Sequence, residues 1–165
     1  MNTLCNLRSE IERDFVFRLR AEPIPGDLRP VWRIAMLVLM LLRAGHGRGM
    51  SLKKALILNW GVRTAETREA LLRMIEGRRR LEDIPVRFDP ALNRALHYAA
   101  AEGLVNIESK TTGSVISMQS AGEIIANLIY KTRDCMETEK AFFDRVRGRM
   151  PETKVKELLD WEATI

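Results

Sequence analysis

Histidine and cysteine, which often bind metals or act as nucleophiles, are scarce in this chain of 165 residues. His46 and His97 stand far apart, so neither belongs to an H-x-x-x-H pair that places two imidazoles on one helix face. Cys5 and Cys135 are also isolated, which is typical of free thiols in a reducing cytoplasm. The sequence therefore predicts no metal site and no cofactor.

The stretch GHGRGM at residues 45–50 combines glycine with positive charge, a combination that can hold a phosphate group. It follows a helical segment instead of a strand, however, and it lacks the G-K-[ST] ending of a P-loop. A turn is therefore the favoured interpretation. Because a G-x-S-x-G motif is also missing, we expect that the protein is not an enzyme.

Positive charge is concentrated in one part of the sequence. The net charge is +5 and the pI is 9.6, but residues 29–80 hold twelve Lys or Arg and three Glu. From residue 84 onward, eleven basic and twelve acidic residues nearly cancel. The local excess favours contact with phosphates or with an acidic partner, and a solvated basic surface is the alternative. The candidate nucleic-acid contacts are Lys53, Lys54, Arg78, Arg79, Arg80 and Lys110.

The elements that must position these residues are predicted to be mostly helices. Residues 1–22 repeat apolar side chains at helical spacing, and a proline-rich linker up to residue 28 follows. Residues 31–43 are almost entirely apolar, which indicates a core helix, since the run is much shorter than the roughly 20 residues of a membrane span. Two more helices are expected, at 51–60 with Ser51 as N-cap and at 65–77 with Thr64 and Thr67 as capping residues.

The order of elements after residue 80 is typical of a winged helix. A short strand is expected at 83–88, and Asp89-Pro90 starts a helix that ends at Gly103. A hairpin follows at 104–118, with Gly113 in its turn. We therefore expect a mostly α protein with a small β-hairpin, built as a winged helix-turn-helix core with additional N- and C-terminal helices.

Ser120 is expected to cap one long helix that reaches Phe143, about seven turns or 40 Å. After Pro151 a last amphipathic helix is expected. The predicted organisation is an N-terminal amphipathic helix and Pro-rich linker at 1–28, a winged-helix domain at 29–134 and a C-terminal helical extension at 135–165.

In a winged helix, the helix before the hairpin reads base edges in the major groove. Here that helix would present Asn93, Arg94 and His97 beside alanines and a glutamate, which is a poor set for base recognition. The hairpin turn adds only Lys110. The sequence therefore favours protein binding over base reading. The alternative is a homodimeric winged-helix transcription regulator whose terminal helices form the dimer interface.

The terminal helices carry more apolar surface than a winged-helix core of about 80 residues needs to cover. They either pack on one another or form an interface with a second copy or with another protein. The candidate interface residues are Ile125, Leu128, Ile129, Leu158, Leu159 and Trp161.

Three stretches and the hairpin carry a family resemblance. SLKKALILNWGVRTAETREALL, IPVRFDPALNRALHYAAAEGLV and SMQSAGEIIANLI resemble, within residues 31–130, the middle component of bacterial ABC three-component systems. These winged-helix proteins are encoded between an effector and an SMC/Rad50-type ATPase in anti-phage defence loci related to Lamassu. The last stretch also resembles the L-T-x-x-G-x-x-x-A segment of many winged helices, but Met118-Gln119 replaces Leu-Thr, so Ser120 is expected to cap the helix.

The resemblance implies a non-catalytic adaptor subunit that binds an SMC/Rad50-like ATPase and an effector protein. It implies no active site at the level of single residues. We expect the adaptor to be cytoplasmic, without membrane association, and to contact DNA, if at all, through phosphate groups.

Overall fold

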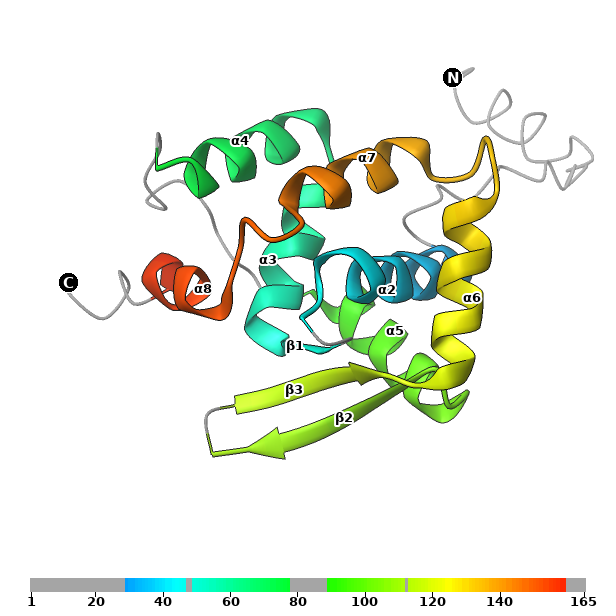
Figure 1. The fold of residues 1–165 in the computed structure, drawn as a ribbon. Coiled ribbons are helices and arrows are strands. Elements are labelled where there is room, and N and C mark those ends of the chain that lie inside the picture. The colour runs from blue at the N-terminus through cyan, green and yellow to red at the C-terminus, as the bar shows by residue number, and fades with distance from the viewer. Residues whose placement is uncertain (1–28, 47–48, 78–88, 112, 160–165) are drawn as a thin grey trace, which may run out of the picture.

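The computed structural model describes residues 29–46, 49–77, 89–111 and 113–159 (Figure 1). This part is mostly helical with one three-stranded antiparallel sheet, as the predicted coarse fold class requires. The predicted N-terminal helix, the strand at 83–88, the cluster Arg78–Arg80 and Trp161 lie outside the described residues. In chain order the elements are α2 (Pro30–Ala44), β1 (Gly49–Ser51), α3 (Leu52–Val62), α4 (Ala65–Ile75), α5 (Pro90–Ala101), β2 (Val105–Lys110), β3 (Gly113–Met118), α6 (Ser120–Lys131), α7 (Glu137–Val146) and α8 (Glu152–Leu159).

Helix α2 is the central helix, against which α5, α6 and α7 pack (Figure 1). Six consecutive side chains, from Met36 to Leu41, are at most 1% exposed. The predicted core helix is thus confirmed, and its burial explains why it has almost no polar face. Within the described residues, no helix is both long and apolar enough to cross a lipid bilayer.

The sheet joins a short strand from early in the chain to the predicted hairpin. β2 and β3 pair antiparallel, and Gly113 adopts a φ of 118°, a conformation that glycine tolerates and other residues rarely adopt. β1 pairs with the other edge of β3, with Met50 opposite Ile116, so the strand order is β1-β3-β2. The sequence predicts a turn and a helix cap at residues 45–51, and β1 is therefore an element that the sequence pattern does not reveal.

Three helices begin at the residues that the sequence predicts. The Ser51 side chain accepts the N–H of Lys54 at the start of α3. Thr64 and Thr67 form a reciprocal capping box at the start of α4. Asp89 caps α5, with proline as the first helical residue. Each acceptor satisfies a backbone N–H that has no partner inside its helix.

The prediction of one long helix over residues 120–143 is wrong. The structure has two helices there, α6 and α7, which run in different directions (Figure 1). Between them, Asp134 and Met136 adopt positive φ angles of 59° and 53°, which a right-handed helix cannot accommodate. The ammonium of Lys140 in α7 donates to the carbonyl of Thr132, so a side chain satisfies part of the open end of α6.

The predicted serine cap of α6 is also wrong. Gln119 precedes the helix, Ser120 is its first residue, and no side chain caps it. Gly122 lies so close to Leu104 that a Cβ would overlap the Leu104 carbonyl oxygen. The same oxygen accepts the N–H of Gln119 at 3.0 Å. Backbone contact with Leu104 therefore takes the place of the expected cap.

Helices α7 and α8 join the core of the preceding elements. Their buried side chains belong to the same hydrophobic cluster as α2, and with the loop between them they contribute Phe142, Phe143, Val146, Met150, Val155 and Leu158. Ser51 at the start of α3 donates to the Glu152 carboxylate from its N–H, at 3.0 Å, and from its hydroxyl, at 2.7 Å. The described part of the C-terminal extension is thus integral to the core.

Candidate functional site

One side of α6 is apolar and open to solvent. We call Ala121, Ile124, Ile125 and Leu128 the α6 face. The side chains of Ile124 and Leu128 are 70% and 66% exposed, and that of Ile125 is 38% exposed. Ala126 is buried, where α6 packs against α2. Exposed aliphatic side chains gathered on one helix are typical of a protein-binding surface.

The candidate interface residues do not all lie on this surface. Ile125 and Leu128 belong to the α6 face, whereas Ile129 is half-buried against the core. Leu158 is buried among the core residues of the same chain, so its prediction as an interface residue is wrong. The side chain of Leu159 and all of Trp161 lie outside the described residues. The sequence analysis missed Ile124, although its spacing to Leu128 is one helical turn.

A buried polar network holds the N-terminus of α5. Asp89 accepts the N–H of Ala91 with one oxygen, and Arg33 and Asn59 donate to the other at 3.1 and 2.9 Å. Arg33 is 4% exposed and also donates to Asn59. Burial alone would raise the pKa of Asp89, but the hydrogen bonds from Asn59 and Ala91 and the charge of Arg33 outweigh it and lower this pKa. The network ties α2, α3 and α5 together.

The outer face of α5 is sparse in base-reading groups. Asn93, Arg94 and His97 are exposed, as the predicted recognition helix requires. Tyr98, which the sequence analysis missed, is also exposed. It borders a hollow of about 250 Å³ whose lining residues are Pro30, Arg33, Ala91, Arg94, Ala95 and Tyr98. Asn93 and Arg94 are the two side chains here that could each form paired hydrogen bonds with a base, and the neighbouring alanines and Tyr98 add no further pair.

No family model, curated protein or solved structure matches the chain. The family resemblance therefore stays a prediction, and the function must be argued from the side chains themselves.

The candidate nucleic-acid contacts lie in different environments. Lys53 is exposed near the start of α3. Lys54 is only 4% exposed, so it does not fit the prediction of a phosphate contact. Burial lowers the pKa of Lys54, and the negative charge of Glu152 opposes that change. Lys110 ends β2 with its ammonium 3.7 Å from the carboxylate of Glu108.

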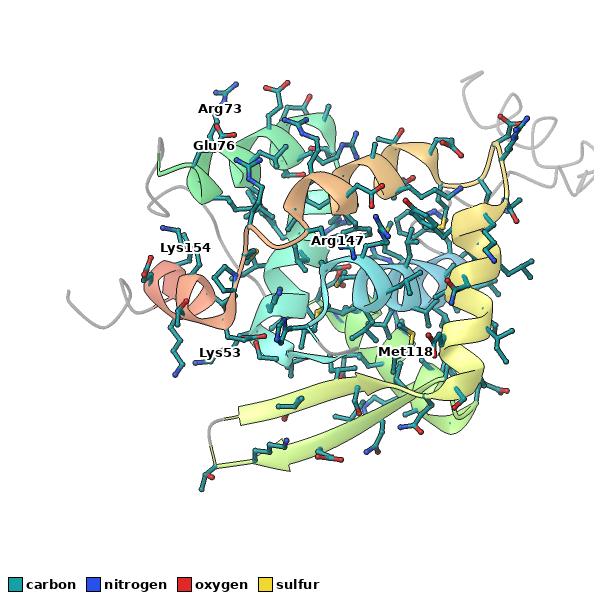
Figure 2. All side chains as sticks on the ribbon, in the orientation of Figure 1. Lys53, Arg73, Glu76, Met118, Arg147 and Lys154 are labelled. Atoms are coloured by element: carbon teal, nitrogen blue, oxygen red, sulfur yellow. The ribbon has the colours of Figure 1, made fainter. Side chains whose placement is uncertain are left out.

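A basic segment that the sequence analysis missed lies beside Lys53. Residues 145–156 contain five Lys or Arg and one Glu. The bonds between Ser51 and Glu152 hold the start of α8 against the start of α3. Figure 2 labels Lys53 at α3, Lys154 at α8 and Arg147 near the end of α7. We call Lys53, Arg147, Arg149 and Lys154 the α8 basic face. The sequence analysis did not detect this local excess, because the basic and acidic residues nearly cancel when they are counted over the whole second half of the sequence.

The side chains considered for metal or nucleophilic chemistry are dispersed. His46 and His97 are exposed on separate elements, and Cys135 is a partly buried free thiol. In the described stretches, no three His, Cys, Asp or Glu residues are placed to share a metal ion.

Replacing Lys54 by methionine is expected to raise the free energy of unfolding by about 1 kcal/mol, because methionine fills the site without a buried charge. The lowered pKa means that the folded state binds its proton less tightly than the unfolded state does. Wild-type stability should therefore rise as pH increases toward the ordinary lysine pKa, and the advantage of the variant should shrink. Urea unfolding of both proteins at pH 7 and pH 10 measures this, and a destabilised variant would contradict it.

Proposed function

We propose that the chain is a winged-helix protein with one additional helix, α4, between the second and third helices of the core. The support is the element order α2, β1, α3, α5, β2, β3 together with the strand order β1-β3-β2. In this arrangement α5 is the counterpart of a recognition helix, and the β2–β3 hairpin is the wing.

We further propose that it is a non-catalytic adaptor subunit, and the α6 face is the observation that carries this proposal. Ala121, Ile124, Ile125 and Leu128 follow the i, i+3, i+4, i+7 spacing with which an amphipathic helix enters a groove on another protein. Three of them are large aliphatic side chains whose burial would stabilise a complex. The sequence resemblance suggests the partners, an SMC/Rad50-type ATPase and an effector in the cytoplasm.

A homodimeric winged-helix regulator is the second candidate, and the symmetry of the same face favours it. In an antiparallel pair of α6 helices with the two-fold axis between Ile124 and Ile125, Ala121 falls opposite Leu128 of a second copy. A small residue opposite a large one allows close packing. The weak set of base-reading groups on α5 argues against this candidate as a sequence-specific regulator.

Replacing Ile124 and Leu128 by aspartate is expected to reduce copurification with the ATPase at least ten-fold, because two exposed aliphatic contacts become charged. The test is co-expression with an SMC/Rad50-type ATPase encoded beside this chain, followed by affinity purification. Thermal unfolding should stay close to the wild type, since both side chains already lie in water.

The matched control replaces Tyr98 and Ile107 by aspartate, because these side chains are also exposed but lie outside α6. The control should retain the ATPase. Equal capture by the α6 variant would refute the adaptor role of this face. A wild-type dimer in light scattering that the α6 variant converts to a monomer would favour the homodimeric regulator instead.

A further inference from the structure

The α8 basic face brings together positive charges that are far apart in the sequence. Lys53 comes from α3, Arg147 and Arg149 from the loop after α7, and Lys154 from α8. Ser51 and Glu152 join the start of α3 to the start of α8 by two hydrogen bonds. Val155 and Leu158 of α8 are buried in the hydrophobic core, which fixes the position of this helix.

Acidic residues pair with two members of this face, Arg149 and Lys154, and a third acidic residue, Glu152, accepts from Ser51. Glu76 accepts from Arg149 at 3.0 Å, and Glu157 accepts from Lys154 at 3.1 Å. Within the described residues, Lys53 and Arg147 have no carboxylate partner. Lys156, exposed on the same helix, is also without one there. The unpaired charges of Lys53, Arg147 and Lys156 create a positive potential that attracts an anionic partner.

The other side chains of this region restrict the kind of anion. The exposed large hydrophobic residues of the described chain belong to α2, α5, β2 and α6, and none belongs to α3, to the loop after α7 or to α8. A protein partner needs a buried apolar or aromatic anchor, and a membrane-binding helix needs apolar side chains to insert. Single-stranded nucleic acid needs aromatic platforms for its bases. In contrast, a surface can bind the regularly spaced phosphates of a duplex with Lys and Arg side chains alone.

We propose that the α8 basic face binds the phosphate backbone of duplex DNA without reading its sequence. Its residues belong to α3, the loop after α7 and α8, and not to α5 or the wing, through which a winged helix reads a groove. Arginine guanidinium groups can bind a phosphate with two hydrogen bonds, and lysine adds a compact charge. The inference goes beyond the adaptor proposal, because it rests on a different surface and on different residues.

The experiment measures binding of the full chain to a fluorescent duplex of arbitrary sequence, by anisotropy at salt concentrations from about 50 to 200 mM. The test variant replaces Lys53, Arg147 and Lys154 by glutamine. Its affinity is expected to fall at least ten-fold, and the slope of log K against log salt is expected to decrease by about two to three. Loss of Lys154 also leaves the carboxylate of Glu157 uncompensated, which adds repulsion.

The control variant replaces Arg94, Lys131 and Arg133 by glutamine, which removes the same charge from exposed positions on α5 and around the end of α6. Its affinity should change less than two-fold. Equal losses in both variants would show that binding follows net charge alone and would overturn the proposal. A larger loss in the control would assign DNA to α5 or to the end of α6, while preference for duplex RNA or for anionic vesicles would assign a different ligand. Circular dichroism and thermal unfolding confirm that both variants are folded.

Discussion

Asp89→Ala is expected to lower the free energy of unfolding by about 3–5 kcal/mol, because it removes the carboxylate that binds the buried guanidinium of Arg33 at 3.1 Å. The change also removes an acceptor for the side-chain amide of Asn59 and the cap of α5. Because the network joins α2, α3 and α5, the loss should affect the whole fold and not only one helix end.

The cost of Asp89→Ala should depend on pH in a defined direction. The folded-state pKa of Asp89 is lowered, so the unfolded state binds its proton more tightly. The stabilisation is therefore fully present above the unfolded-state pKa, which lies near 4, and is lost as pH falls through the lower folded-state value. The difference between the wild type and the variant should be large at pH 7 and should shrink in strong acid.

Urea unfolding at a series of pH values measures both effects. Asp144→Ala is the matched control, because Asp144 also binds an arginine, Arg43, and a second donor, Tyr130, but its side chain is 37% exposed against 15% for Asp89. Exposed ion pairs contribute about 0–1 kcal/mol, so this variant should cost little. If Asp89→Ala costs no more than Asp144→Ala, the buried network does not stabilise the fold as argued.

Gly122→Ala is the second large effect that we expect, with a loss of about 2 kcal/mol. Alanine favours helix over glycine by about 1 kcal/mol, so helix propensity alone predicts the opposite sign. The added methyl group meets the carbonyl oxygen of Leu104, which is backbone and cannot move aside by changing its rotamer. Helix α6 must therefore move away from Leu104, and the hydrogen bond from Gln119 to that oxygen should weaken.

Thermal and urea unfolding measure the loss, and hydrogen exchange at the Gln119 amide locates it. Ala121→Gly is the control, because Ala121 is the exposed neighbour in the same helical turn. This control should cost at most about 1 kcal/mol through helix propensity and should not expose the Gln119 amide. A stabilised Gly122→Ala variant would mean that the start of α6 does not rest on Leu104.

Local signals in the sequence predict much of the fold. Ser51, Thr64 and Asp89 each combine an acceptor side chain with a following helical pattern, and each occupies the predicted N-terminal cap. The apolar run in α2 and the glycine in the hairpin turn are likewise local features. Such features act within a few residues, so one sequence is enough to identify them.

The features that the sequence conceals depend on distant contacts. Strand β1 has three residues and exists through its pairing with β3, more than 60 residues further along the chain. The break after α6 is hidden because apolar residues keep helical spacing across it, while the decisive left-handed residues, Asp134 and Met136, are not glycines. Burial of Lys54, whose pKa responds to the charge of Glu152 in α8, has no local signature either, since a lysine pair usually indicates exposed surface.

The candidate surfaces were predictable to different degrees. Helical periodicity indicated an apolar stripe at Ile125 and Leu128, but only packing of α6 on α2 distinguishes these exposed residues from half-buried Ile129. Leu158 also belongs to an amphipathic helical pattern, yet its side chain is part of the core. For the α8 basic face, Lys53 was identified and Lys154 was not, because the link between Ser51 and Glu152, which joins their helices, has no signal in the sequence.

The central position of α2 has a consequence for synthesis of the protein on the ribosome. Its packing partners α5, α6 and α7 are all encoded later, and the last of them ends at Val146. At about 5–20 residues per second, the ribosome needs roughly 5–20 seconds after α2 to complete α7. During that interval the most apolar helix of the nascent chain lacks its native cover, which makes it a natural binding site for a chaperone.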